Sequence, residues 1–255
     1  MMRRLHLHLF TILFVAWVLT SPARASDTDY REAMRALGVK DYATALRYLE
    51  AAVTNEPDNV RYASEYRQAA IQAKEFDRSL QLFEKLAVEH PNSANIHLNF
   101  GFAYVDKIPA AGSITQVILA NNALKEFSKA VELEPSWINY YTRGMSYLFW
   151  PKVFNRASFG VEDLNNALKV QKAGPRRSYH VKTYLGLGDG YWKSDDLKEA
   201  RATWRLGLQE FPDNPELKAR LTQEGDQLKT TIEAAFDPNK RVDTNLRELW
   251  EHSPN

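Results

Sequence analysis

Three glycines at alternate positions, Gly186, Gly188 and Gly190, have the spacing in this chain that most suggests phosphate binding. Glycine-rich dinucleotide loops follow a strand, and their third glycine comes three residues after the second. Here that position is Tyr191, and a loop of this kind would also need a strand before it. We therefore interpret the stretch LGLGDGYW as part of a tightly packed helix rather than as a nucleotide site.

Histidine, serine and cysteine offer no other catalytic set. The histidines after residue 25 are far apart and none has metal-ligand helix spacing; they are His90, His97, His180 and His252. No nucleophile-elbow motif occurs, and the chain has no cysteine. Acidic pairs at 162–163 and 195–196 stand at predicted helix starts, where the helix dipole explains them. The sequence therefore predicts no enzyme, no metal and no cofactor, with His97 on a helix surface.

A repeat of about 34 residues organises the chain, as the spacing of Pro57 and Pro91 shows. Each copy has an aromatic residue or leucine, a small residue three positions on, a bulky residue four on, a small or leucine residue three on, and proline five on. The copies are Tyr42, Ala45, Leu49, Ala52 and Pro57; Phe76, Ser79, Phe83, Leu86 and Pro91; and Leu197, Ala200, Trp204, Gly207 and Pro212. Spacings of three and four place these side chains on one helix face.

The preceding segments FGFAY, RGMSY and LGDGY share a glycine three residues before a tyrosine, which is one helical turn. Together these patterns resemble the tetratricopeptide repeat (TPR) family over about residues 27–214, in an exported bacterial form. The resemblance implies an all-α solenoid, a right-handed superhelix of helical hairpins with a C-terminal capping helix. It also implies that Gly188 is a close-packing position. The expected repeats are 27–58, 59–92, 93–136, 137–180 and 181–213.

Two adjacent repeats carry insertions, near 106–122 and 148–160. In the first, Ser113 is expected to cap a second helix lengthened by about three turns. In the second, Pro151 is expected to end the preceding helix near Trp150. We expect both insertions to project from one edge of the solenoid, either packed on each other or presented to a partner. The candidate contact residues of this inserted edge are Trp150, Lys152, Phe154, Arg156 and Phe159.

The family resemblance also implies a concave groove lined by the first helix of each repeat. The family's contact positions, carried over one repeat at a time, are Tyr30, Met34, Arg61, Ser64, Gln68, Asn95, Phe102, Tyr141, Met145, Phe149, Leu185, Asp189 and Trp192. Arg61 and Asn95 suggest a clamp for a peptide carboxylate, but repeat four supplies no matching basic residue. The aromatic second half suits an apolar peptide, a helix or an apolar small ligand, unless curvature buries these rings.

The N-terminus resembles a secretory signal. Arg3 and Arg4 precede the apolar run Leu9–Leu19, which is short for a membrane span, and Ala23-Arg24-Ala25 fits a cleavage site before Ser26. The alternative is an uncleaved anchor. Cleavage after residue 25 leaves 30 basic and 32 acidic side chains, a balance that favours neither nucleic acid nor a membrane surface. A chain without cysteine also has no lipoprotein attachment site. We therefore expect a periplasmic protein, with full secretion left open.

After the repeats, residues 214–255 are predicted to form a cap. One polar helix is expected over about Pro215 to Ala235. The tail DTNLRELWEH is expected either to dock Leu246, Leu249 and Trp250 on that cap or to serve as a peptide that a partner captures. The sequence thus predicts an adaptor that binds a protein or peptide in the cell envelope. The alternative is a periplasmic accessory protein of a transport system that binds a small apolar ligand.

Overall fold

The computed structural model describes residues 22–237 and 240–251, which form helices joined by short turns and no strands. The α-helices are α1 Pro22–Gly38, α2 Tyr42–Asn55, α3 Val60–Ala73, α4 Phe76–Glu89, α5 Ala94–Lys107, α6 Ser113–Leu133, α7 Trp137–Leu148, α8 Ala157–Ala173, α9 Val181–Lys193, α10 Leu197–Glu210, α11 Pro215–Thr222, α12 Gly225–Ala235 and α13 Glu248–Glu251. The 3₁₀ turns are η1 Ile108–Ala110, η2 Lys152–Phe154 and η3 Ser178–His180.

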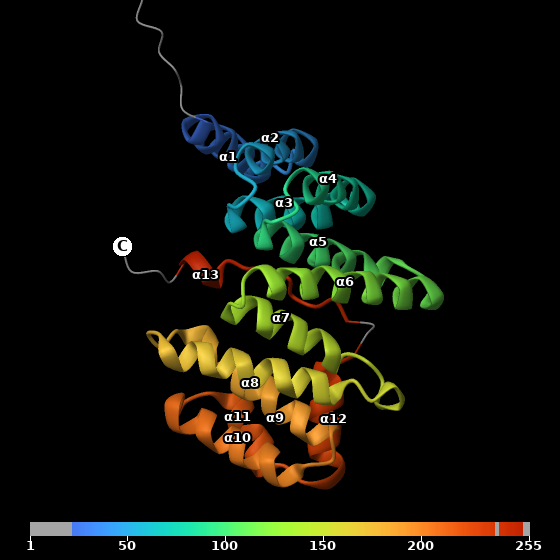
Figure 1. Ribbon diagram of the computed structural model, residues 1–255, viewed down its shortest axis with the longest axis vertical. Coiled ribbons are helices and arrows are strands. Elements are labelled where there is room, and N and C mark those ends of the chain that lie inside the picture. Colours follow the sequence, from blue (N-terminus) through green and yellow to red (C-terminus); the bar gives the residue numbers. More distant parts are fainter. Residues whose placement is uncertain (1–21, 238–239, 252–255) are drawn as a thin grey trace, which may run out of the picture.

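Helices α1 to α10 pack as five consecutive pairs, and each pair stacks on the next to form a solenoid (Figure 1). Side-chain caps fix several helix starts. Asp41, Asn59, Ser93, Asp196 and Asn214 each accept a hydrogen bond from a backbone N–H in the first turn, at 2.8–3.3 Å. The predicted all-α solenoid is confirmed.

Gly188 lies where α9 approaches α10, as predicted for a close-packing position. A Cβ atom at Gly188 would collide with the indole of Trp204, a side chain with no exposed surface. The indole therefore takes the place that a larger residue on α9 would need. This packing explains the glycine without a phosphate, and it leaves the glycine-rich stretch inside a helix.

The two insertions differ in form. Helix α6 runs for 21 residues from Ser113, so the lengthened helix is present, but Ser113 is not its cap. The N-cap is Gly112, and no side-chain cap bond is made there. In the second insertion α7 ends at Leu148, just before Pro151, and η2 follows. Proline removes a backbone N–H and restricts the residue before it, which accounts for this end.

The C-terminal cap is two helices rather than the single helix expected over 215–235. Helix α11 ends at Thr222, and α12 begins at Gly225, whose φ of +51° suits glycine. This break turns α12 back against α9 and α7. Its buried side chains Leu228 and Ile232 join the cluster formed by Leu148, Leu164 and Leu185. The C-terminal segment therefore leaves the end of the solenoid and returns along it.

In the described part of the chain, no helix combines the length and apolarity needed to cross a bilayer. The predicted signal segment lies almost wholly outside the described residues. Its expected cleavage point, before Ser26, falls in the first turns of α1. The contact of α1 with α3, a 2.6 Å bond from the Tyr62 hydroxyl to Asp27, lies beyond that point.

Candidate functional site

The chain's own C-terminal segment occupies the groove formed by the first helices of the repeats. Helix α12 fills the C-terminal half, and residues 240–251, here called the tail, lie across α3 and α5. Figure 1 shows α13, at the end of the tail, beside the middle of the solenoid and far from α11. The tail was expected to dock on the cap, if it docked at all. That location is wrong, because Leu246 instead enters the apolar cluster around Leu98 and Phe127.

Thr244 is held by a buried polar network from two helices. Arg67 on α3 donates from Nη2 to the Thr244 carbonyl at 2.9 Å, and the Thr244 hydroxyl donates to Oδ1 of Asp106 on α5 at 2.6 Å. Gln68 adds a bond to the same hydroxyl at 3.3 Å. Both main-chain and side-chain atoms of one tail residue are thus recognised.

Arg67 and Asp106 also pair with each other, from Nη1 to Oδ2 at 2.9 Å, with both side chains almost fully buried. Arg67 donates a further bond from Nε to Asn99 at 2.9 Å, and its guanidinium stacks over the Phe102 ring. Burial raises the pKa of Asp106 above its ordinary value, although Arg67 and the Thr244 hydroxyl oppose this effect. The pair, Asn99 and Phe102 all belong to the solenoid itself.

Residues two apart in the tail point the same way. Thr244 and Leu246 are buried, whereas Asp243 and Arg247 are exposed, an alternation typical of an extended segment. The Leu246 N–H donates to the Ser64 hydroxyl at 3.3 Å. Asp243 and Asn245 accept bonds from backbone amides two residues on, at 2.9 and 2.8 Å, which stiffens the segment.

Two ion pairs hold the end of the tail. Arg247 forms a forked pair with Glu65 on α3, with N···O distances of 2.8 and 3.0 Å. Glu248 accepts from Nζ of Lys182 on α9 at 2.6 and 2.7 Å. We call the surface that contacts the tail the tail site; it is formed by Ser64, Glu65, Arg67, Gln68, Leu98, Phe102, Asp106 and Lys182.

Several predicted groove residues in the first three repeats meet at or beside the tail site. Ser64 and Gln68 bond the tail, and Phe102 packs on the same apolar cluster as Leu249 and Trp250. Arg61 donates to the Tyr30 hydroxyl at 3.0 Å and lies over its ring. Two residues lie elsewhere: Met34 packs on the core of the first repeats, and Asn95 donates to the Asp58 carbonyl. The bonded partners of Arg61 and Asn95 are therefore both within the solenoid.

The predicted groove residues of the last two repeats are largely covered. Tyr141 stacks on Trp137 at 5.0 Å between ring centroids, Met145 lies against Gly186, and Phe149 meets the Phe236 ring at 5.3 Å. Leu185 is buried beneath α12. Asp189 forms a buried forked pair with Arg220 of α11, at 2.6 and 2.7 Å. The alternative that some of these side chains are buried therefore holds. The cap covers Phe149, Leu185 and Asp189, whereas Tyr141 and Met145 pack within the solenoid itself.

Sequence reasoning missed the strongest groups of the tail site, Glu65, Arg67 and Asp106, and also Asn99, which bonds Arg67 beside it. Two signals were available. Glu65 shares a helix face with Arg61 and Gln68, and Asn99 and Asp106 lie on the face of Asn95 and Phe102 at helical spacing. Arg67 gave no such signal, because its full burial depends on contacts with another helix and with the tail.

The inserted edge is partly packed and partly exposed. Trp150 is buried, and the Arg156 guanidinium covers its ring at 3.7 Å while bonding Asn121 of the other insertion at 3.3 Å. The two insertions thus contact each other. Phe154 and Phe159 remain 53% and 55% exposed, and Ile114 on α6 is 83% exposed. The two interpretations of this edge coexist, with some aromatics buried and others presented.

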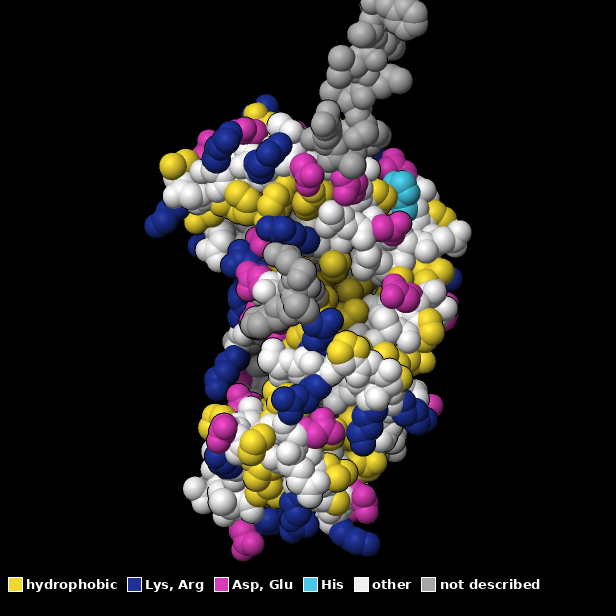
Figure 2. All heavy atoms as spheres, turned by 90° about the vertical axis from the view of Figure 1, so that its left-hand side faces the viewer, with side chains coloured by type: hydrophobic (Ala, Val, Ile, Leu, Met, Phe, Trp, Pro, Cys, Tyr) yellow, Lys and Arg dark blue, Asp and Glu magenta, His cyan; other side chains and the backbone are white. Residues whose placement is uncertain are grey.

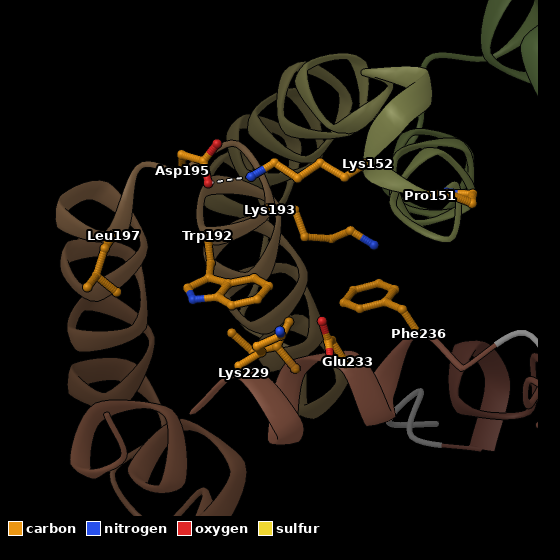
Figure 3. A pocket seen from close by; sticks show the side chains of 10 residues that line it. Pro151, Lys152, Trp192, Lys193, Asp195, Leu197, Lys229, Glu233 and Phe236 are labelled. Atoms are coloured by element: carbon orange, nitrogen blue, oxygen red, sulfur yellow. Dashed lines mark hydrogen bonds and ion pairs between the residues drawn. The ribbon is translucent and has the colours of Figure 1, made fainter. Parts of the chain in front are cut away.

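A pocket of about 620 Å³ lies between the second insertion, the end of α9 and α12. Trp192 and Phe236 lie on either side of it, and the Lys193 ammonium is above the Phe236 ring at 4.6 Å (Figure 3). Burial lowers the pKa of Lys193. Lys152 pairs with Asp195 at the rim. The pocket thus brings together one predicted groove residue, Trp192, and one predicted edge residue, Lys152.

His97 is buried rather than on a helix surface. Its Nδ1 lies 2.7 Å from Glu126 of α6, and its Nε2 lies 3.1 Å from the Pro91 carbonyl. The ring therefore links α5 to its neighbours, which the spacing on α5 alone could not indicate. Within residues 22–237 and 240–251, no group of three or more His, Asp or Glu side chains could hold a metal ion.

Charges of both signs are spread over the face that Figure 2 shows, with hydrophobic side chains between them. The outline of the molecule is indented at mid-height in this view. A mixed surface of this kind suits a partner with charges of both signs, as the tail itself has with Arg247 and Glu248.

The comparisons with known proteins agree on the architecture. A family model described as tetratricopeptide repeat matches residues 36–99. No curated protein matches the chain in sequence. Among solved structures, a thermophilic TPR protein of Thermus thermophilus, TTC0263, is 18% identical, with a TM-score of 0.54 and coverage of 77% of this chain and 97% of that one.

Two further structures show the same fold. A tetratricopeptide repeat protein of Parabacteroides merdae is 16% identical, with a TM-score of 0.55 and coverage of 85% and 81%. MamA of Desulfovibrio magneticus is 19% identical, with a TM-score of 0.51 and coverage of 74% and 97%. At these identities the likeness concerns the fold.

Proposed function

Because the chain is a tetratricopeptide repeat protein, we propose that it is an adaptor that binds an extended segment of another protein in the bacterial cell envelope. TPR proteins generally act as scaffolds for protein–protein contacts, whereas the partner of each is set by its own groove. The groove of this chain therefore carries the argument.

The observation that most supports this proposal is that the groove already holds a peptide. The tail is bound through a main-chain carbonyl, a main-chain N–H, a buried leucine and a charged side chain. These are the elements of extended-peptide recognition: main-chain bonds supply affinity, and pockets for alternate side chains supply specificity. A groove that holds one such segment in cis can hold a similar one in trans.

An envelope location is supported by the N-terminal sequence. Two arginines, the apolar run Leu9–Leu19 and the small-residue motif before Ser26 have the order of a cleavable signal. The lack of cysteine fits a protein that gains its stability from packing rather than from disulfides. The product would be periplasmic, with α1 beginning near Ser26.

The inserted edge is the proposed second contact surface. Ile114, Phe154 and Phe159 are more than half exposed, and they belong to the two insertions, the second of which also carries Lys152 and Arg156. Exposed apolar groups gathered in this way are typical of protein interaction sites. A partner held in the groove would be able to extend over this edge.

One observation favours the alternative of a small apolar ligand. The pocket between Trp192 and Phe236 has two aromatic walls and three lysines, Lys152, Lys193 and Lys229, at its margins. Its volume falls within the range of small-molecule sites.

Site-specific photocrosslinking in a Gram-negative periplasm tests the proposal. A photoreactive residue would replace Gln68 in the groove, Phe154 at the inserted edge, or the exposed Val88 on α4 as a matched control. Adaptor function predicts a discrete crosslinked protein from Gln68 and none from Val88. Crosslinks only from Phe154 would move the contact to the edge. A small molecule retained in native mass spectrometry, without protein crosslinks, would favour the ligand-binding alternative.

The same cells test the location. If the protein is exported, it should appear in the periplasmic fraction, and its mass should be that of a chain that begins at Ser26. A chain that keeps its first 25 residues and stays with the membranes would indicate an anchored form instead.

A further inference from the structure

The side chains of the tail site determine which peptide sequence can bind there. Reading the tail from Thr244, the site contacts a threonine, skips a residue, buries a leucine and pairs an arginine. Asn245, the skipped residue, is half exposed and turns its side chain to its own backbone. The site therefore distinguishes three positions of four.

Each of these three positions has its own determinant. Threonine is selected because its hydroxyl both donates to Asp106 and accepts from Gln68. Leucine is selected by apolar surface from two repeats, since Leu246 shares a buried cluster with Leu98 on α5, and Phe102 on α5 and Ile138 on α7 pack against that cluster. A residue without a hydroxyl in place of threonine would leave Asp106 and Gln68 without this hydrogen-bond partner. A polar residue in place of leucine would be buried against the apolar surface of the site.

Arginine is selected by geometry as well as charge. Glu65 is almost fully buried, and its two oxygens face the Nε and Nη2 atoms of Arg247 in a forked pair. A lysine could supply the charge but not the fork. The residue after it, Glu248, meets Lys182, so the charge order of the tail is opposite to that of the site.

The site does not need the tail to remain formed. Arg67 keeps its bonds to Asn99 and Asp106 inside the solenoid when Thr244 leaves, so no buried charge is left unpaired. The tail itself adds one short helix, α13, and its Arg247 side chain is 46% exposed. A surface that is complete without its occupant is suited to exchange.

We infer that the tail is a resident occupant of the tail site, and that the site takes in trans a partner segment of the form Thr-x-Leu-Arg in extended conformation. This inference rests on the proposed adaptor function and names the partner chemistry. Because the tail is tethered, its effective concentration is high, on the order of millimolar, and it sets the affinity that a partner must exceed. The tail thereby restricts the groove to segments that match it well.

A peptide-binding experiment on the full chain tests this inference. Leu246→Asp with Arg247→Glu would release the tail and leave every residue of the tail site unchanged. The probe is a fluorescein-labelled peptide with the sequence of residues 240–251, KRVDTNLRELWE. We expect the released variant to bind the probe at least about tenfold more tightly than the unaltered chain, whose own tail competes.

Charge exchange provides the control for folding. A probe with glutamate at the position of Arg247 should bind the released variant about tenfold more weakly than the parent probe, and Glu65→Lys in the protein should restore its binding. A probe with serine at the position of Asn245, whose hydroxyl can also accept from the backbone amide two residues on, should bind like the parent, since that side chain bonds its own backbone rather than the site. Equal binding of all probes, or no binding to the released variant, would overturn the inference.

Two outcomes separate this inference from the adaptor proposal. Crosslinks from Gln68 without peptide binding would retain the adaptor and reject the Thr-x-Leu-Arg segment. Peptide binding without any crosslinked protein would retain the site and reject the adaptor. Light scattering tests whether the partner is a second copy of the chain. If the unaltered chain were dimeric and the released variant monomeric, the site would bind the tail of a second copy, and the inference that it binds a different protein would be wrong.

Discussion

The two halves of the groove are filled by one C-terminal segment in two different ways. In the C-terminal half α12 buries Leu228, Ile232 and Phe236 against the last repeats, as a helix in a groove does. In the N-terminal half the tail is extended up to Leu246, before the short helix α13, and it is held mainly by hydrogen bonds and ion pairs. The difference separates a part of the cap that stabilises the solenoid from a part that can be exchanged.

Each half also contains a buried Arg–Asp pair, and the two pairs differ in whether they bond the tail. Arg67 and Asp106 both bond Thr244 of the tail. Arg220 and Asp189 bond each other between α11 and α9, at 2.6 and 2.7 Å, and no bond joins them to the described residues of the tail. Only the first pair links solenoid packing to the tail, which makes the two pairs a matched comparison.

Replacing the arginine of either pair should have the largest effect. Arg67→Met and Arg220→Met each leave a buried aspartate unpaired, at an expected cost of about 3–5 kcal/mol in the free energy of unfolding, measured with urea. Only Arg67→Met should also raise hydrogen exchange at the amide of Leu246. If Arg220→Met exposed that amide equally, the two halves would not be independent.

Removing an apolar side chain from α12 should come next. Ile232 has no exposed surface, so Ile232→Ala is expected to lower the free energy of unfolding by about 2–4 kcal/mol. The exposed neighbour Glu233 provides the control, and Glu233→Ala should change the urea midpoint little. A small loss from Ile232→Ala would mean that α12 detaches as easily as the tail.

The corresponding change in the tail should cost less. Leu246 is also buried, at 4% exposure, yet Leu246→Ala is expected to lower the free energy of unfolding by only about 1 kcal/mol. The reason is that the tail can undock while the solenoid stays folded. The loss of stability therefore cannot exceed the free energy with which the tail docks. Faster exchange of tail amides with an unchanged solenoid would show this; Val242→Ala, at an exposed position, serves as the control.

A smaller effect is expected from pH in the C-terminal half. Burial lowers the pKa of His180, Arg177 acts in the same direction and Glu210 opposes it. A neutral His180 accepts from the Arg177 N–H at 3.2 Å, so its contribution is present above its unfolded pKa, about 6.5, and is lost as pH falls from there through the lowered pKa of the folded protein.

Urea midpoints at pH 7.5 and 5.5 measure the change. His180→Asn, which keeps an acceptor and cannot be protonated, should flatten the pH dependence. The protection of tail amides from hydrogen exchange should depend on pH less strongly than the urea midpoint does. The opposite order would place the pH-sensitive contact at the tail rather than at the bond between His180 and the Arg177 N–H.

The solenoid could be predicted from sequence because each repeat contacts its neighbours, so that packing leaves a period. Tyr42, Leu49 and Pro57 recur at 34 residues for this reason. Glycines such as Gly188 also indicate where two helices pack closely against each other.

The occupant of the groove left no such period. Thr244 meets Arg67 across 177 positions, and nothing near either residue indicates the other. The break before Gly225 was visible as a glycine, but its consequence, the return of α12, depends on packing against α9. The expected groove residues Met145 and Leu185 were therefore placed on the right helices and assigned too much exposure.

The long separation between the tail and its site has a consequence for the order in which the molecule is completed. The repeats form contacts between neighbours as soon as each has emerged, whereas the groove closes only when the last residues of the chain arrive. An exported chain would pass through a stage in which the solenoid is assembled and the tail site is open. A partner present at the membrane during that interval would meet a vacant groove, and binding would not require displacement.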